Sequence, residues 1–199
     1  MKTYNHNEHS RYIESQIRRH SCRQRLTKDR EKFRQRDILD LKRLSPSTKS
    51  VLCVGARHES EVESFINTGF DAIGIDVVPC ASKLVHRLDM HDLLNEFGQD
   101  SWDVVFSSHS LEHARNSIDV LRQMISVARL GVYLILPVMN SPTESDCSVF
   151  SFMENEESSD VESISTELNS YGLTGFNVID SHVEKTPISE IHIFLDVTS

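Results

Sequence analysis

The sequence contains few cysteines, few glycines and no long apolar run. Its four cysteines, Cys22, Cys53, Cys80 and Cys147, are widely spaced among 199 residues and form no C-x-x-C pair. This spacing argues against a disulfide framework or a cysteine-rich zinc site, and we interpret the cysteines as reduced thiols of an intracellular, cytoplasmic protein. No stretch approaches the ~20 apolar residues of a membrane helix, and residues 1–12 lack the apolar segment of a secretory signal. We therefore expect no association with a membrane.

Positive charge is concentrated at the start of the chain. Residues 1–50 hold 14 lysines and arginines against 6 acidic residues, whereas residues 51–199 hold 7 against 24, for a net charge of -9. Residues 8–43 lack proline and glycine, which favours one or two helices, and the second is expected to dock through Phe33 and the apolar residues of segment 38–44. The segment SPSTKS has turn composition. We predict a basic helical extension over residues 1–49 and a main domain over residues 50–199.

Two roles are open for the basic extension. Residues 11–43 suit RNA or another anionic partner, because lysine and arginine neutralise phosphates. Alternatively, the extension packs on the acidic remainder of its own chain, or on that of a second subunit in an oligomer. The interspersed acidic residues and the scarcity of aromatic stacking residues favour packing over RNA binding.

The sequence after residue 50 alternates short apolar runs with amphipathic stretches. Strands are predicted over residues 51–55, 71–76, 83–89, 102–108 and 132–138, and helices over residues 58–70, 91–98, 117–131 and 160–172. Such alternation predicts βαβ units, and so a mostly parallel, Rossmann-like α/β sheet with helices on both faces. Residues 175–185 and 189–199 are expected to form a hairpin that turns at Thr186-Pro187. The polar, acidic segment 140–160 is expected to be a long surface loop or a lid.

Candidate ligand-binding residues, most of them polar, lie at the carboxyl ends of the predicted strands, where ligands bind in open parallel sheets. These residues are Gly55, Asp76, Asp89, Met90, Ser107 and His109. Asp76 ends the second strand about 20 residues after the glycine turn of the first, which suits hydrogen bonding to ribose hydroxyls, although a helix-capping role is the alternative. A dinucleotide-binding loop needs three glycines, and only Gly55 is present, so NAD is not favoured.

Three segments together resemble class I S-adenosylmethionine-dependent methyltransferases of the small-molecule type. They are VLCVGARHESEVESFINTGFDAIGIDVVP, LDMHDL and WDVVFSSHSLEHARN, and they are similar to a subgroup whose first motif reads V-G-A-R followed by E-V and G-I-D. The resemblance covers residues 50–138, and the C-terminal region by topology. It implies a sheet of seven strands with the last one antiparallel, S-adenosylmethionine as cofactor, and a small-molecule methyl acceptor.

The resemblance also implies roles for individual residues. Gly55 and Ala56 would let the backbone approach the methionine part of the cofactor, and Asp76 would bind its ribose hydroxyls. Contacts with adenine would come from Val77, Asp89 and Met90. Ser107 and His109, at the end of the fourth strand, would face the sulfonium and the acceptor.

The sequence departs from the family pattern at three places. Cys53 stands where the family usually has an acid that holds the cofactor's ammonium group. Arg57 replaces a glycine, and it either pairs with the cofactor carboxylate or with an acid such as Glu61 or Glu63. The segment A-R-L-G stands before the fifth strand, where many members have a Pro-Gly-Gly turn.

The segment His109-Ser110-Leu111-Glu112-His113 has the H-x-x-E-H pattern of a zinc-peptidase family. That chemistry needs both histidines on one helical face, whereas His109 directly follows an apolar strand, so we expect no metal site. We expect His109 to act as a base, with help from Glu112 or His113, if the acceptor must lose a proton. The alternative function is a catalytically inactive methyltransferase-like binding or assembly module, which Cys53 and the single glycine favour.

Overall fold

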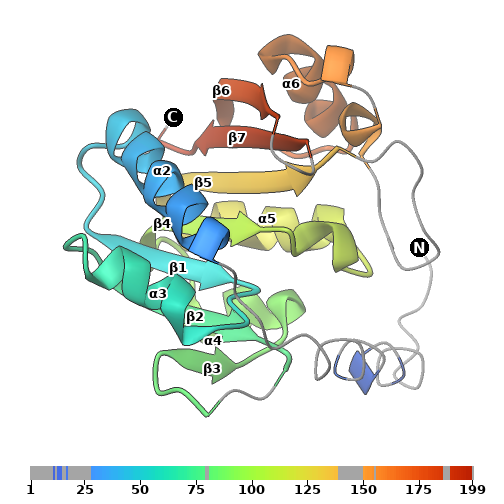
Figure 1. The fold of residues 1–199 in the computed structure, drawn as a ribbon. Coiled ribbons are helices and arrows are strands. Elements are labelled where there is room, and N and C mark those ends of the chain that lie inside the picture. Colours follow the sequence, from blue (N-terminus) through green and yellow to red (C-terminus); the bar gives the residue numbers. More distant parts are fainter. Residues whose placement is uncertain are drawn as a thin grey trace.

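The computed structural model contains a seven-stranded sheet. It describes residues 28–78, 81–138, 150–154, 156–185 and 189–198, together with Arg11, Ile13, Glu14 and Ile17. The strand order is β3-β2-β1-β4-β5-β7-β6 (Figure 1). The strands are β1 (Ser50–Val54), β2 (Asp71–Asp76), β3 (Val85–Arg87), β4 (Trp102–Ser108), β5 (Ala128–Pro137), β6 (Asn177–Glu184) and β7 (Glu190–Asp196). Among the described strands, β7 is the one that runs opposite to the other six, so the predicted Rossmann-like fold with an antiparallel last strand is confirmed.

Helices cover both faces of this sheet. The helices are α2 (Lys28–Leu44), α3 (Glu59–Ile66), α4 (Leu93–Phe97), α5 (Ser117–Val127) and α6 (Val161–Ser170). Residues of α2 and α3 share one apolar cluster with one face of the sheet, and residues of α4, α5 and α6 share a second cluster with the other face. Figure 1 shows α2 lying across the face opposite to α5. The central strands are thus buried on both sides, which explains why β1, β4 and β5 have continuous apolar runs.

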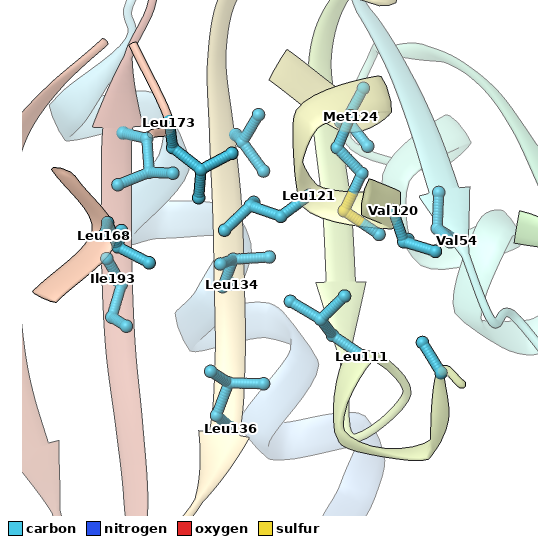
Figure 2. Close-up of a cluster of buried hydrophobic side chains, with 14 of the residues drawn as sticks. Val54, Leu111, Val120, Leu121, Met124, Leu134, Leu136, Leu168, Leu173 and Ile193 are labelled. Atoms are coloured by element: carbon cyan, nitrogen blue, oxygen red, sulfur yellow. The ribbon is translucent and has the colours of Figure 1, made fainter. Parts of the chain in front are cut away.

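The larger core lies under α5 and α6. Leu121 and Met124 of α5 meet Val54 and Leu134 of the sheet, while Leu168 of α6 packs towards Ile193 of β7 (Figure 2).

An N-cap side chain fixes the residue at which each of the helices α5 and α6 begins. The Asn116 side chain accepts a hydrogen bond from the Asp119 amide at the start of α5, and Asp160 accepts two at the start of α6. Both are N-cap residues of the preferred type.

The boundary between α5 and β5 differs from the prediction. The helix ends at Val127 and not at Gly131, because the segment A-R-L-G is the first part of β5 and pairs with β4. Gly131 is needed there for close packing, since an added Cβ would lie 2.5 Å from Cζ of Phe194. The segment A-R-L-G, which stands where many family members have a Pro-Gly-Gly turn, is therefore part of strand β5.

Part of segment 140–160 is held in the core, which contradicts the expectation of a loop or lid throughout. Phe150, Phe152 and Met153 are buried, and the first two rings stack with centroids 5.1 Å apart. Short 3-10 turns, η3 (Ser151–Met153) and η4 (Glu156–Ser158), follow one another here. Residues 139–149 and Thr186-Pro187, where the hairpin turn was predicted, lie outside the described residues.

The second half of the basic extension packs on the main domain. Ile38 and Leu41 of α2 are buried in the core, whereas Phe33 has no described side chain. Three arginines of this helix contact acids of the main domain. The pairs are Arg34–Glu61 at 2.7 Å, Arg36–Glu184, and Arg43–Asp180 at 2.9 Å. The packing alternative therefore holds for the described part of α2, and RNA binding stays a prediction.

A charged cluster closes the edge of the sheet at the amino ends of the parallel strands. Asp103 accepts hydrogen bonds from the amides of Lys49 and Ser50, at 2.8 and 3.0 Å, and pairs with Arg129 at 2.6 Å. Partial burial alone would raise the pKa of Asp103, but these donors lower it below its ordinary value. Among the described helices, none combines the length and apolarity needed to cross a membrane.

Candidate active site

A cleft opens at the carboxyl ends of the parallel strands. It encloses about 490 Å³, including space open to solvent. Its walls come from the ends of β1, β2 and β4 and from the segment after β3. The lining residues are Gly55, Arg57, Ile75, Asp76, Val77, Leu88, Asp89, Met90, His91, His109, Ser110 and His113. Parallel α/β sheets place their ligand sites at this edge, and the cleft brings together most of the residues predicted from the sequence.

The turn after β1 lets the chain pass very close to the end of β4. Gly55 has a φ of +79°, a conformation that glycine adopts without strain. An added Cβ at this position would lie 2.0 Å from Oγ of Ser110. The amides of Gly55 and Ala56 both donate to the carbonyl of Ile75, at 2.8 and 3.0 Å, so the turn is fixed against β2. The turn after β1 is therefore held close to both neighbouring strand ends, with Ser110 directly against Gly55.

Asp76 lies in this cleft at the end of β2. Its side chain is 8% exposed, and Oδ1 accepts a hydrogen bond from the Val78 amide at 2.7 Å. Burial raises the pKa of Asp76 above its ordinary value, although the Val78 amide and the charges of Arg57 and His58 oppose this shift. A partly desolvated carboxylate with remaining acceptor capacity suits a pair of sugar hydroxyls. The next residue, Val77, lines the same wall.

A second wall comes from the segment after β3. Asp89 caps the 3-10 turn η1 (Met90–Asp92) and accepts hydrogen bonds from the amide of His91 at 3.0 Å and from its Nδ1 at 2.6 Å. Gln123 of α5 donates to the carbonyl of His91 at 2.8 Å, which fixes this turn to the neighbouring helix. Asp89, Met90 and His91 therefore face the cleft together.

His109 occupies a strained position at the end of β4. Its φ is +50°, which is uncommon for a residue other than glycine and costs of order 1–3 kcal/mol. The amide of His109 donates to the carbonyl of Ile135 at 2.9 Å, and Nε2 lies 2.6 Å from Oε1 of Glu190 on β7. Burial alone would raise the pKa of Glu190, but the hydrogen bond with His109 and the nearby His192 hold it at about 2. Glu190 is thus a carboxylate.

The two predicted helpers of His109 lie on the 3-10 turn η2 (Leu111–His113). Glu112 is 2% exposed and does not line the cleft, and its Oε1 is 4.0 Å from Nδ1 of His109 and 3.9 Å from Nε2 of His113. His113 does line the cleft. His109 precedes η2, so the two histidines do not share a helical face and the zinc-peptidase geometry is not formed.

Comparison with known proteins agrees with this arrangement. Residues 26–173 match the family described as Methyltransferase domain. The chain belongs to the class I S-adenosylmethionine-dependent methyltransferases. The predicted family is therefore confirmed, and with it the expectation of an enzyme family that uses S-adenosylmethionine. No curated protein matches the sequence.

Solved structures of other methyltransferases share this fold at low sequence identity. The chain superimposes with a TM-score of 0.71 on the 1,6-didemethyltoxoflavin-N1-methyltransferase of Burkholderia thailandensis, at 13% identity over 100% of this chain and 93% of that one. A methyltransferase from Archaeoglobus fulgidus gives 0.54 at 15% identity over 82% and 94%. The magnesium protoporphyrin IX methyltransferase of Synechocystis gives 0.54 at 13% identity over 82% and 79%.

Besides Glu112, three residues singled out in the sequence do not line the cleft of this methyltransferase. Ala56 and Ser107 are buried, and Oγ of Ser107 has no hydrogen-bond partner within the described part of the chain. Cys53 is fully buried in the core under α2 and α3, where burial, followed by the charge of Glu61, raises the pKa of its thiol well above the ordinary value. The Cys53 thiol is therefore enclosed in the core and does not reach the cleft.

Sequence reasoning missed several residues of the methyltransferase cleft. Ser110 and His91 line it, and Glu190 reaches His109 from the last strand. Ser110 lies within S-S-H-S-L-E-H, a part of the segments that resemble the family, so its place in the cleft could have been predicted from the sequence. Glu190 was not, because no local pattern links it to a residue 81 positions away.

A second polar cluster of the methyltransferase lies under α2, on β6 and β7. Nitrogen and carboxylate atoms of His182, Glu184 and His192 lie within 4.8 Å of one another, the spacing that a metal site needs. However, the two imidazole rings stack with an interplanar angle of 16°, and one ion cannot lie in the plane of both rings. Arg36 also places a guanidinium on Glu184. The cluster is therefore arranged as a charge-paired network.

Proposed function

We propose that this chain transfers a methyl group from S-adenosylmethionine, bound in the cleft at the strand ends, to a small-molecule acceptor. The observation that supports this most is Asp76, a carboxylate at the end of β2 that faces the cleft beside the glycine turn of β1. In a chain of this family, that pairing offers a hydrogen-bond acceptor for ribose next to a turn without a side chain.

The cleft residues divide into two proposed groups. Asp76 would bind the ribose hydroxyls, and the turn at Gly55 would receive the methionine part, with Arg57 near its carboxylate. The adenine would lie between Val77 and the segment Asp89–Met90. When bound, the cofactor supplies an activated methyl group, so the protein mainly has to align the acceptor and exclude water. His109 and His113 line the opposite wall, where the acceptor would bind.

Two observations support a small molecule as acceptor. The excess of acidic residues after residue 50 disfavours a polyanion at the cleft. Two methyltransferases of the same fold also favour a small-molecule acceptor. One is the Burkholderia thailandensis enzyme, whose structure contains 1,6-didemethyltoxoflavin and S-adenosylhomocysteine, and the other is the magnesium protoporphyrin IX methyltransferase.

We propose that the main role of the basic extension is to pack on the main domain. Arg34, Arg36 and Arg43 contact acids of the main domain, which leaves fewer charges for phosphates. Binding of RNA by the remaining basic residues of segment 11–43 would appear as an affinity that falls steeply with salt, and sedimentation would test an oligomer. Reduced cysteines fit a cytoplasmic location, which cell fractionation would test.

Calorimetry with S-adenosylhomocysteine tests the cofactor site. Replacing Asp76 with alanine removes charged hydrogen bonds worth about 1.5–3 kcal/mol each, so affinity should fall by at least about 100-fold. Asp71→Ala is the matched control, because Asp71 is an exposed acid at the other end of the same strand. Equal affinity in the wild type and in Asp76→Ala, with both folded, would refute the assignment.

An inactive binding module is the second candidate function. It is favoured by Cys53, which points into the core at the position of the family's ammonium-binding acid. Incubation with S-adenosylmethionine carrying a labelled methyl group, with metabolite extracts and with total RNA in parallel, separates the candidates. Label on small molecules supports the enzyme, label on RNA alone refutes a small-molecule acceptor, and cofactor binding without any transfer supports the module.

A further inference from the structure

A glutamine of α5 ties one wall of the cleft to the rest of the domain. Gln123 donates from Nε2 to the carbonyl of His91 at 2.8 Å, and its Oε1 accepts from the amide of Leu94 at 3.1 Å. Nε2 also donates to Oδ2 of Asp119, one turn earlier on α5, at 3.2 Å. One side chain therefore links α5 both to the turn η1 and to the start of α4.

These three contacts determine the orientation of the Gln123 amide. The carbonyl of His91 and the carboxylate of Asp119 only accept hydrogen bonds, whereas the amide of Leu94 only donates one. A flipped amide would place Oε1 against two oxygen atoms and Nε2 against an N–H group. The Gln123 side chain is therefore held in one arrangement, and it grips the chain on both sides of Asp92.

The segment that Gln123 holds carries the wall of the cleft after β3. Leu88, Asp89, Met90 and His91 line this wall, whereas Gln123 itself does not line the cleft. The carboxylate of Asp89 is oriented by the amide and the ring of His91, at 3.0 and 2.6 Å. Since Gln123 binds the carbonyl of the same His91, a shift of this residue would also shift the carboxylate of Asp89.

We propose that Gln123 is a positioning residue for adenine recognition, which holds the Asp89 carboxylate where it accepts a hydrogen bond from the adenine amino group. This inference rests on the proposed function. Hypoxanthine carries an oxygen where adenine carries the amino group, so it offers this carboxylate a second acceptor in place of a donor. A carboxylate held in one place therefore rejects hypoxanthine, whereas one that is able to move away rejects it less.

Calorimetry on the full-length protein tests this proposal with S-adenosylhomocysteine and S-inosylhomocysteine. Gln123→Met keeps the length and helix propensity of the side chain but removes its hydrogen-bonding groups. The wild type should bind S-adenosylhomocysteine at least about 10-fold more tightly than the inosyl compound. In Gln123→Met this preference should fall below about 3-fold, because the adenosyl compound loses affinity. Equal losses for both compounds, or the same preference in both proteins, would overturn the proposal.

Hydrogen exchange of the free protein measures how firmly the wall is held. Peptides that cover residues 88–95 should exchange about 10-fold faster in Gln123→Met, because two hydrogen bonds to this segment are lost. Peptides from β1 and β4 should exchange as in the wild type. An unchanged rate in residues 88–95, or an equal rise throughout the sheet, would reject the positioning role.

Ser126→Ala is the matched control on the same helix. The Ser126 hydroxyl donates to the carbonyl of Arg122 at 2.9 Å, a bond within α5 itself. Its loss should leave the exchange of residues 88–95 and the adenine preference within about 2-fold, and changes as large as those of Gln123→Met would reject a specific role for Gln123. A wild type that does not bind S-adenosylhomocysteine rejects the proposed function. Binding without a preference for adenine in the wild type rejects the role of Gln123 alone.

Discussion

The Gly55→Ala substitution would place a methyl group where Ser110 already lies. The backbone at Gly55 has a φ of +79°, and a left-handed conformation costs an L-residue roughly 1–2 kcal/mol. The new Cβ would also lie 2.0 Å from Oγ and 2.4 Å from Cβ of Ser110, so the end of β4 has to move. Overpacking of this kind typically costs about 1–3 kcal/mol. Together, the free energy of unfolding should fall by about 2–5 kcal/mol.

Urea unfolding of two glycine variants separates the two parts of this cost. Gly69 has a φ of +96° and nothing within 4 Å of an added Cβ, so Gly69→Ala measures the backbone cost alone. Adding Ser110→Gly to Gly55→Ala should recover the packing cost, and the double-mutant cycle gives its size. Gly55→Ala should also weaken the binding of S-adenosylhomocysteine, because the displaced Ser110 lines the cleft.

If Gly55→Ala and Gly69→Ala lose the same stability within about 0.5 kcal/mol, the close approach of the ends of β1 and β4 does not restrict the size of the side chain at position 55, and the packing explanation is wrong. The same conclusion follows if adding Ser110→Gly to Gly55→Ala restores none of the lost free energy of unfolding.

Three substitutions and one labelling reaction test the rest of the fold. Because hydrogen bonds lower the folded-state pKa of Asp103, its carboxylate stabilises the fold fully above about pH 4 and less as the pH falls through that pKa. Asp103→Asn should therefore cost about 2–3 kcal/mol in urea unfolding at pH 7, and this cost should shrink as the pH falls below about 4. Arg34→Ala should cost about 3 kcal/mol, because it leaves the largely buried Glu61 without its guanidinium, whereas Arg43→Ala, in an exposed pair, should cost less than about 1 kcal/mol. Equal costs would show that burial does not separate these pairs. Cys53 should resist iodoacetamide in the native protein and react in urea, as measured by mass spectrometry of its peptide, and rapid native labelling would contradict its burial.

The order of strands and helices was predictable because each central strand is buried on both faces. Runs such as those of β1 and β4 are apolar throughout, and their alternation with amphipathic helices leaves few topologies. The resemblance of residues 50–138 then gave the position of Asp76 and Asp89 in the cleft. These residues follow strands directly, so the sequence alone indicates where they lie.

The errors arise where distant parts of the chain meet. Alanine, arginine and leucine favour helices and a glycine favours a helix end, so local preferences extend α5 to Gly131. The competing effect is Phe194 of β7, whose ring covers this glycine in the sheet. The same strand supplies Glu190, which no local pattern connects with His109. Ser107 is buried, and the same strand end lines the cleft through His109 and Ser110 instead.

The position of β7 has a consequence for synthesis of the chain. It is made after β6, yet it lies between β5 and β6, so one side of β5 has no partner until residues 190–196 exist. Any product ending earlier would present Val132–Leu136 as an open apolar edge, which invites intermolecular pairing. Among nested C-terminal deletions, solubility should therefore collapse as soon as this seven-residue strand is cut into, long before the cofactor cleft is reached.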